Sequence, residues 1–219
     1  MVLRRALLIG NSRWHWAELH QEQWCFDHAE PDQRRLGSEP LIWAAVGAVP
    51  DQLVDEPCRP RLRLRHVPLE GCPPWLGVDR ALGAWEAWQR ELRCSKPSDR
   101  GVLLADAGTV LSLTLLDRHG HFQGGQLIPG LHLQLRSMGL ATSLLPAGVK
   151  LEKVPDDPFP VATDQAMRRG VIQAIVASVQ DAQRISGASL WVCGGDAPLL
   201  ESELNSRGIR CRSDSTLQL

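Results

Sequence analysis

The sequence predicts an α/β protein made of two similar lobes around a shared cleft. Strand-like and helix-like apolar patterns alternate along 219 residues, of which 43% are hydrophobic, and one strand–turn–strand pattern occurs twice. A chain of this length and composition can bury one large core or two small ones. The repeated pattern starts near residues 3 and 102, so we expect one lobe over residues 1–97 and the second over residues 98–219.

The first half is predicted to contain a hairpin, further strands and one helix. Residues 3–9, which are apolar apart from Arg4 and Arg5, lead into the turn Gly10-Asn11-Ser12. Apolar or alternating runs predict three more strands, at residues 14–19, 41–46 and 61–67. Apolar residues at helical spacing predict a helix over residues 78–93, and its inward positions are Val78, Ala81, Leu82, Trp85 and Leu92.

The second half repeats the hairpin and then alternates helices with strands. The hairpin strands are expected at residues 102–105 and 110–116. Helices are predicted at 130–140, 164–185 and 199–205, with a Pro- and Asp-rich loop at 146–160 and strands at 189–193 and 209–212. The inward face of the longest helix is expected to hold Ala166, Met167, Ile172, Ile175, Val176 and Val179.

The turn of the second hairpin has the residues of a phosphate site. Asp106 ends one apolar run, and Gly108 and Thr109 open the next, which puts a carboxylate, a hydroxyl and free backbone N–H groups together. Such a carboxylate suits two tasks, accepting a proton from a substrate hydroxyl or holding Mg²⁺ through water. The usual phosphate loop differs because it runs from a strand into a helix. On these residues alone, an ordinary β-hairpin is an equal alternative.

Three further clusters allow both a binding and a purely structural interpretation. Gly10-Asn11-Ser12 offers phosphate oxygens an amide and a hydroxyl, or forms an ordinary turn. Asp79 and Arg80 follow Gly77 at a helix start, where the helix dipole alone favours a carboxylate and solvent favours an arginine. Gly194-Gly195 lets the backbone approach a ribose or phosphate, although such turns are common.

Charge and hydropathy exclude two classes of partner. The formal net charge of −1 gives no basic field for a nucleic-acid backbone. No apolar run approaches the roughly 20 residues that span a bilayer. The apolar stretch near the N-terminus is too short for a signal peptide. We therefore expect a cytoplasmic protein that binds neither nucleic acid nor membranes.

Taken in chain order, the clusters resemble the type III pantothenate kinase family, within the acetate kinase, sugar kinase and actin superfamily. The matching motifs are GNS, GVDR, DAGT, GGQLIPG, a Thr before a helix, and a strand ending in GGDA. The intervening segments LIWAAVGAVP and ATSLLP also fit, and the resemblance runs from about Leu7 to Asn205. It implies two actin-like (ribonuclease H-like) lobes, each with a mixed sheet and flanking helices, around an interlobe cleft.

The resemblance implies ATP-dependent phosphorylation of pantothenate to 4′-phosphopantothenate, the first step of coenzyme A biosynthesis, with Mg²⁺ as the metal. Asp106 matches the catalytic base of the family. The positions matching ATP or phosphate contacts are Gly10, Asn11, Ser12, Gly108, Thr109, Gly194 and Gly195. Those matching pantothenate contacts are Gly77, Asp79, Arg80 and Thr163. In the family this Thr reaches pantothenate from the neighbouring subunit, so a homodimer with its active site near the subunit interface is implied.

Three positions depart from the family pattern. The family usually has an Asp two residues before the first Gly, helping to position Mg²⁺, and Leu8 stands there. Aligning Gly10 with Gly108 in the internal repeat also pairs Leu8 with Asp106. Thr114 replaces an Asp associated with a monovalent cation, which leaves a requirement for K⁺ or NH₄⁺ open. The chain has no Tyr for the pantothenate pocket, and Trp75 or a neighbour is expected to fill that volume.

Two alternatives to an active pantothenate kinase follow from these departures. One is a non-catalytic homologue that binds nucleotide or pantothenate and acts as a regulator, which Leu8 and Thr114 motivate. The other is a kinase or phosphatase of the same superfamily that acts on another small hydroxylated acid. Retention of Asp106, Asp79 and Arg80 favours the active pantothenate kinase.

Overall fold

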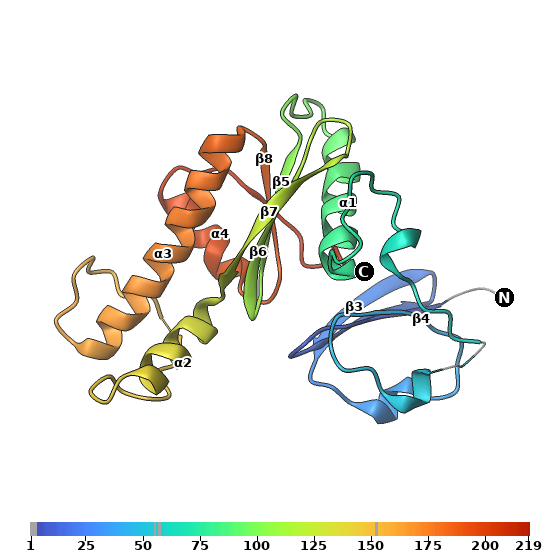
Figure 1. The fold of residues 1–219 in the computed structure, drawn as a ribbon, viewed down its shortest axis with the longest axis horizontal. Helices are drawn as coiled ribbons and strands as arrows, with labels where there is room; N and C mark the ends of the chain where they lie inside the picture. Colours follow the sequence, from blue (N-terminus) through green and yellow to red (C-terminus); the bar gives the residue numbers. More distant parts are fainter. Residues whose placement is uncertain (1–3, 55, 57, 152) are drawn as a thin grey trace.

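The computed structural model describes residues 4–54, 56, 58–151 and 153–219, which fold around two β-sheets (Figure 1). The first sheet has the order β3-β2-β1-β4, with β1 (Arg5–Ile9), β2 (Trp14–His20), β3 (Gln23–Ala29) and β4 (Ile42–Ala45). The second has the order β7-β6-β5-β8-β9, with β5 (Val102–Ala107), β6 (Val110–Leu116), β7 (Phe122–Pro129), β8 (Ser189–Cys193) and β9 (Arg212–Ser213).

The two sheets share one pairing pattern, as the internal repeat predicts. β1 is antiparallel to β2 and parallel to β4, while β5 is antiparallel to β6 and parallel to β8. Leu8 and Asp106 are each the second-to-last residue of their strand. The alignment of Leu8 with Asp106 is therefore also an alignment of structural positions, and the predicted α/β fold with two mixed sheets is confirmed.

Four α-helices surround the second sheet. They are α1 (Val78–Leu92), α2 (Leu131–Ala141), α3 (Thr163–Ser186) and α4 (Ala197–Ser206). In Figure 1, α1 lies between the two sheets, and it packs against β5, β6 and β8 while also contacting β4. α3 and α4 cover the opposite face of the second sheet, and α2 packs on α3. Within the described part of the chain, no helix is long and apolar enough to cross a membrane.

The alternation of side chains along β5 decides where Asp106 lies. Leu103, Ala105 and Ala107 belong to the core cluster that includes α3, whereas Leu104 packs with the buried residues of α1. Because successive side chains of a strand point to opposite faces, Asp106 lies on the face of α1. The strand thus delivers its carboxylate between the second sheet and α1.

Glu91 links α1 by hydrogen bonds to β8 and β9 of the second sheet. This carboxylate is 2% exposed, and its Oε2 accepts hydrogen bonds from Trp191 Nε1 at 2.9 Å and Arg212 Nη1 at 2.7 Å. Its Oε1 accepts from Ser189 Oγ at 2.8 Å and from the Ser98 backbone N–H at 3.0 Å. A buried carboxylate needs such partners, and here they fix the position of the helix.

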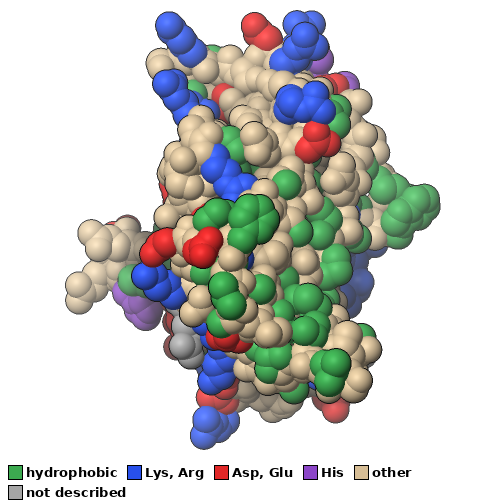
Figure 2. All heavy atoms as spheres, turned by 90° about the vertical axis from the view of Figure 1, so that its left-hand side faces the viewer, with side chains coloured by type: hydrophobic (Ala, Val, Ile, Leu, Met, Phe, Trp, Pro, Cys, Tyr) green, Lys and Arg blue, Asp and Glu red, His purple; other side chains and the backbone are tan. Residues whose placement is uncertain are grey.

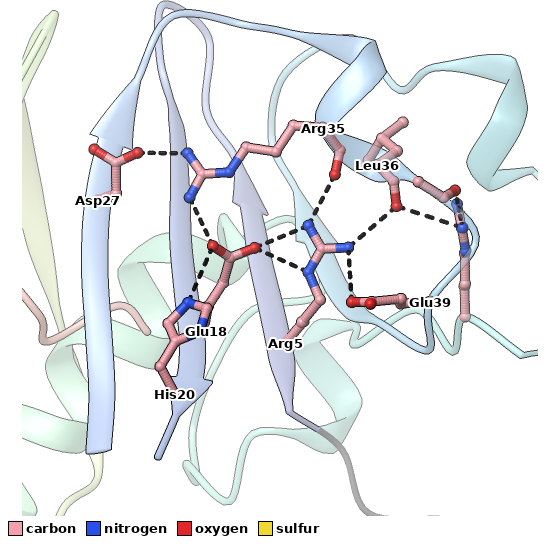
Figure 3. A network of polar contacts seen from close by, with 9 residues as sticks. Arg5, Glu18, His20, Asp27, Arg35, Leu36 and Glu39 are labelled. Atoms are coloured by element: carbon pink, nitrogen blue, oxygen red, sulfur yellow. Dashed lines mark hydrogen bonds and ion pairs between the residues drawn. The ribbon is translucent and has the colours of Figure 1, made fainter. Parts of the chain in front are cut away.

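An ion network stabilises the first sheet on the side away from α1 (Figure 3). Glu18 on β2 accepts hydrogen bonds from Arg5 Nε on β1 at 2.9 Å and from Arg35 Nη2 at 3.0 Å. Arg35 belongs to a short 3₁₀ helix (η1, Gln33–Leu36) and also pairs with Asp27 on β3. Both arginines lie over the Trp16 ring, so they link the strands and η1 around one aromatic side chain.

Several expected elements differ in the structure. Residues 61–67 are not a strand: Arg61 makes a single bridge to Trp43, and a 3₁₀ helix (η3, Leu64–His66) follows. The last strand lies at Arg212–Ser213 instead of 209–212. β3 was not predicted, because it is a mostly exposed edge strand without a clear apolar face. β7 was not predicted either, because it contains two glycines and ends in proline.

The four predicted helices are confirmed, with two errors in their inward faces. Leu92 is 48% exposed, and Ala84 and Ala87 are buried on α1 instead. Ala166 is exposed on α3, whose buried residues are Met167, Val171, Ile172, Ile175, Val176 and Val179. Leu92 comes directly after Glu91, whose side chain faces the second sheet, and the rotation of about 100° per helical residue turns Leu92 toward solvent.

Candidate active site

The two hairpin turns, one from each sheet, contact one another. The first turn lies between β1 and β2, the second between β5 and β6, and 97 residues separate them. Ser12 Oγ of the first and Thr109 Oγ1 of the second are 2.8 Å apart, within hydrogen-bond distance. The sequence predicts that the two turns face a shared cleft, and the structure places their hydroxyls at one point.

Glycines beside these turns permit close backbone packing. A Cβ at Gly130 would lie 2.1 Å from the Gly108 carbonyl oxygen, and a Cβ at Gly47 would lie 2.2 Å from that of Gly10. Gly194, which follows β8, has a φ of 94°, and a Cβ there would lie 2.6 Å from Asp106 Oδ1. Only glycine therefore fits beside the Asp106 carboxylate at this turn.

Asp106 has the most perturbed carboxyl group of the site. Burial raises its pKa from 3.8 to about 6, and the charge of Asp79 adds to this effect. Hydrogen bonds from Gln218 and Cys193 and the charge of Arg80 act in the opposite direction. The distance from Gln218 Nε2 to Asp106 Oδ2 is 2.7 Å. The carboxyl group is mostly ionised at neutral pH yet has a pKa close to that of an efficient general base.

The first turn of α1 brings Asp79 and Arg80 to the same region. Asp79 Oδ1 accepts a hydrogen bond from the Arg80 backbone N–H at 2.8 Å, and burial raises its pKa. Arg80 Nε donates to Thr114 Oγ1 at 3.2 Å, and Arg80 Nη2 to the Leu113 carbonyl at 3.3 Å. A Cβ at Gly125 would lie 2.6 Å from Arg80 Nη2, so β7 leaves space for the guanidinium. Arg80 is therefore not a solvated surface charge.

A second charged group borders the turn that follows β8. The Asp196 backbone N–H donates to the Ala107 carbonyl at 2.9 Å, and Asp196 Oδ1 lies 3.6 Å from His132 Nε2. Burial raises the pKa of Asp196, while the charges of His132 and of Arg13 lower it. Arg13 follows the first turn directly in sequence, so it brings a positive charge from one lobe toward Asp196 of the other. The sequence predicts no role for Asp196 or His132.

Comparison with known proteins shows which family shares this chain's sequence. The family described as "Type III pantothenate kinase" matches residues 68–184. A type III pantothenate kinase of Synechococcus elongatus is 34% identical over 224 residues, covering 90% of this chain and 86% of the relative. One from Synechococcus sp. strain JA-3-3Ab is 33% identical over 226 residues, covering 98% and 88%. The chain belongs to the type III pantothenate kinase family.

Solved structures support the fold of this type III pantothenate kinase. A Campylobacter jejuni protein described as a conserved member of the Baf family of transcriptional activators aligns with a TM-score of 0.70 at 18% identity, covering 98% of this chain and 92% of that one. The activator of 2-hydroxyisocaproyl-CoA dehydratase from Clostridium difficile, with bound ADPNP, aligns with a TM-score of 0.54 at 10% identity, covering 100% and 90%. These similarities show the two-lobed, actin-like fold.

Compared with the family pattern, this type III pantothenate kinase lacks acidic groups at two positions of the site. Leu8 is 2% exposed and packs against Ala44 and the α1 residues Val78 and Ala81. Thr114 is fully buried, and its hydroxyl accepts from Arg80. Among the residues that the structure describes, no group of three or more His, Cys, Asp or Glu side chains is arranged to hold a metal ion.

Two further residues that the sequence assigns to the site lie apart from the groups described above. Thr163 begins α3 and is exposed, and no hydrogen bond within the described residues joins it to Asp106, Asp79 or Arg80. Trp75 is 83% exposed in this structure, and the expectation that it or another residue of the Cys72 to Trp75 stretch fills the volume of the family's pocket Tyr stays a prediction.

Proposed function

We propose that this site transfers the γ-phosphoryl group of ATP to the primary hydroxyl of pantothenate, which yields 4′-phosphopantothenate in the first step of coenzyme A biosynthesis. The observation that supports it most is the position of Asp106. Its carboxylate ends a strand directly before one of two apposed turns and faces the first turn of α1, which holds Asp79 and Arg80. Family membership supplies the substrates, ATP and pantothenate.

Asp106 acts in this proposal as the general base. With a pKa near 6, the carboxylate is ionised at neutral pH and accepts the proton of the pantothenate hydroxyl as that oxygen attacks the γ-phosphorus in line. The bond to the β-phosphate oxygen breaks, and ADP leaves. Because phosphoryl transfer depends mainly on positioning and charge, a base with modest basicity is sufficient.

The first turn of α1 binds pantothenate. The Arg80 guanidinium pairs with the substrate carboxylate, for which its planar fork is suited, and the Asp79 carboxylate accepts hydrogen bonds from substrate hydroxyl or amide groups. Gly77 supports this geometry, because a Cβ there would lie 2.4 Å from Asp79 Oδ1. Both charged side chains are half-buried, which strengthens their interactions with a bound ligand.

The turns of both lobes bind the nucleotide. The backbone and side chains of Gly10, Asn11, Ser12, Gly108 and Thr109 face the phosphates, and Gly194 and Gly195 border the nucleoside. The hydroxyls of Ser12 and Thr109, which pair with one another in this structure, donate to phosphate oxygens when ATP is bound. Small residues at both turns let backbone N–H groups approach the anion.

The metal requirement follows from the acidic groups that the site retains. The family implies a divalent ion with ATP, and we infer Mg²⁺, which neutralises phosphate charge in the transfer. Since the described residues form no group of three or more side chains arranged to hold a metal ion, Mg²⁺ would be held mostly by phosphate oxygens and water, as is common for this ion. Arg80 Nε lies 3.2 Å from Thr114 Oγ1 and repels a cation there, so we expect no K⁺ or NH₄⁺ at that position.

A cytoplasmic homodimer completes the proposal. Figure 2 shows hydrophobic side chains gathered on the face that carries α2 and α3, where Leu140, Leu144, Phe159 and Val161 are exposed. An apolar surface of this kind suits a protein interface. Thr163 lies two residues after Val161, so a partner seated there would receive Thr163 in its own pantothenate site.

A mixing experiment tests the dimer and the role of Thr163 together. Asp106→Asn and Thr163→Ala subunits are each expected to be inactive, whereas an unfolded and refolded mixture contains heterodimers in which one site has both residues intact. Recovery of activity toward the statistical limit supports the shared site. A mixture as inactive as its components contradicts it.

The activity itself is tested with purified protein, ATP, Mg²⁺ and pantothenate, with and without K⁺, and the product is identified by mass spectrometry. We expect 4′-phosphopantothenate at equal rates in both buffers. The replacement of an acidic residue by Leu8 favours one alternative, a non-catalytic homologue that regulates by binding nucleotide. It predicts thermal stabilisation by ATP or pantothenate without product, and detection of product would exclude it.

A further inference from the structure

Gln218 contacts the catalytic carboxylate from a segment that no motif includes. Its side-chain Nε2 donates to Asp106 Oδ2 at 2.7 Å, although 112 residues separate the two in sequence. The segment that follows β9 runs back along α1 toward the first sheet, where Figure 1 marks the end of the chain. Gln218 thus reaches Asp106 from the side of α1.

The segment around Gln218 is fixed to α1 by three kinds of contact. Arg90 of α1 forms an ion pair with Asp214, and its Nη2 donates to Thr216 Oγ1 at 3.2 Å. Leu217 is 2% exposed and packs in the cluster that holds the α1 alanines and Leu104. The Leu219 backbone N–H donates to the Thr216 carbonyl at 2.9 Å, which closes a turn around Gln218. The amide is therefore held in place.

A glycine inside α1 provides the space for this side chain. A Cβ at Gly83 would lie 3.2 Å from Gln218 Cγ and 3.0 Å from Leu104 Cδ2. Glycine within a helix costs about 1 kcal/mol relative to alanine. Here the missing methyl group lets the Gln218 stem pass over the helix. The space that Gly83 leaves is an observation independent of the hydrogen bond, and it supports the same position of the Gln218 side chain.

The Asp106 carboxylate is confined at both oxygens. Oδ2 accepts from Gln218, while Oδ1 lies beside the Gly194 backbone. The other charged or titratable groups that face the carboxyl are Asp79 and Arg80 of α1 and Cys193 of β8. Asp79 disfavours the ionised form, so an N–H donor at Oδ2 both orients the carboxylate and favours its ionisation.

We propose that Gln218 is a positioning residue for phosphoryl transfer, whose amide holds the Asp106 carboxylate in the orientation that accepts the substrate proton. The proposal rests on the assignment of Asp106 as the base. Gln218 needs no contact with either substrate for this role. Its loss is therefore expected to lower kcat while leaving both KM values unchanged.

The test uses Gln218→Met, which keeps the length of the side chain and removes the donor. We expect kcat to fall about 10- to 100-fold, as for loss of a hydrogen bond to a charged group, and the acidic limb of the kcat/KM profile to move to higher pH. Gly83→Ala, which displaces the Gln218 stem, is expected to change both quantities in the same direction. Gln123→Met is the matched control, because Gln123 Nε2 donates to the Asp117 carboxylate at 3.1 Å at the opposite end of β6.

Each outcome separates this inference from the proposed function. An active wild-type enzyme whose Gln218→Met variant keeps the wild-type kcat and pH profile overturns the role of Gln218. If Gln218→Met unfolds, as judged by tryptophan fluorescence, Gly83→Ala decides by the same two measurements. A folded wild-type enzyme that forms no product refutes the proposed function, and the role of Gln218 with it.

Discussion

Replacing Asp106 with Asn is predicted to abolish turnover and to stabilise the fold. The variant removes the base but keeps a carbonyl oxygen that accepts from Gln218. In the native protein, burial raises the pKa of Asp106 from 3.8 to about 6, so ionising this group costs folding free energy. At 1.36 kcal/mol per pH unit, the cost is about 3 kcal/mol when the group is fully ionised in both states.

The pH dependence of this effect has a definite sign. The cost is fully present above about pH 6 and disappears as the pH falls toward 4, because the native carboxyl group is protonated first. The free energy of unfolding of Asp106→Asn should therefore exceed that of the wild type by about 3 kcal/mol at pH 8 and equal it near pH 4. Urea denaturation followed by tryptophan fluorescence at both pH values measures the difference.

Asp117 provides a matched control, for which the predicted change in stability has the opposite sign. Burial alone would raise the pKa of Asp117, but the backbone N–H groups of His121 and His119 outweigh it and lower the pKa. Asp117→Asn should therefore destabilise the protein at pH 8. A variant at position 106 that is less stable than the wild type at pH 8, or whose stability difference does not change with pH, refutes the account of Asp106.

Two other predictions concern the substrate site and the packing of α1. Arg80→Met should raise the KM for pantothenate about 10- to 100-fold and leave the KM for ATP unchanged, because it removes the ion pair proposed between Arg80 and the substrate carboxylate. Steady-state kinetics with each substrate varied in turn measure both KM values, and a rise in the KM for ATP instead would contradict the assignment. Glu91→Ala should lower the free energy of unfolding by about 1–3 kcal/mol, because it leaves the buried Trp191 Nε1 without its hydrogen-bond acceptor. A loss below 1 kcal/mol in urea denaturation would contradict this.

Local patterns were sufficient for most of the fold. Apolar spacing placed α1 and α3 within two residues of their bounds, an apolar run placed β5, and the period of two placed β6. β3 and β7 were not predicted, because they form strands through pairing with β2 and β6 and not through the pattern of their own side chains. The lobe boundary near residue 97 stays a prediction, since α1 packs on the second sheet and also contacts β4.

The residues of the candidate site also divide into those that local sequence motifs predict and those that they do not. Both turns and the start of α1 were found because each is a short motif whose residues adjoin in sequence. Gln218 and the pair of Asp196 and His132 could not be found, because their roles depend on which distant segments the fold brings together. Arg13 gave a weak local signal as a cation beside a phosphate-like turn. Only the parallel pairing of β5 with β8 gives that cation an acidic partner.

The hydroxyl pair formed by Ser12 and Thr109 has a consequence for the catalytic cycle. The two oxygens are 2.8 Å apart, so one hydroxyl already donates to the other in the absence of nucleotide. In the proposed nucleotide site, a phosphate oxygen must replace this internal partner, so part of the binding free energy of the nucleotide is used to break the pair. The pair would form again once the proposed product ADP has left. It would thus lower the affinity for nucleotide and, at the same time, favour the departure of product.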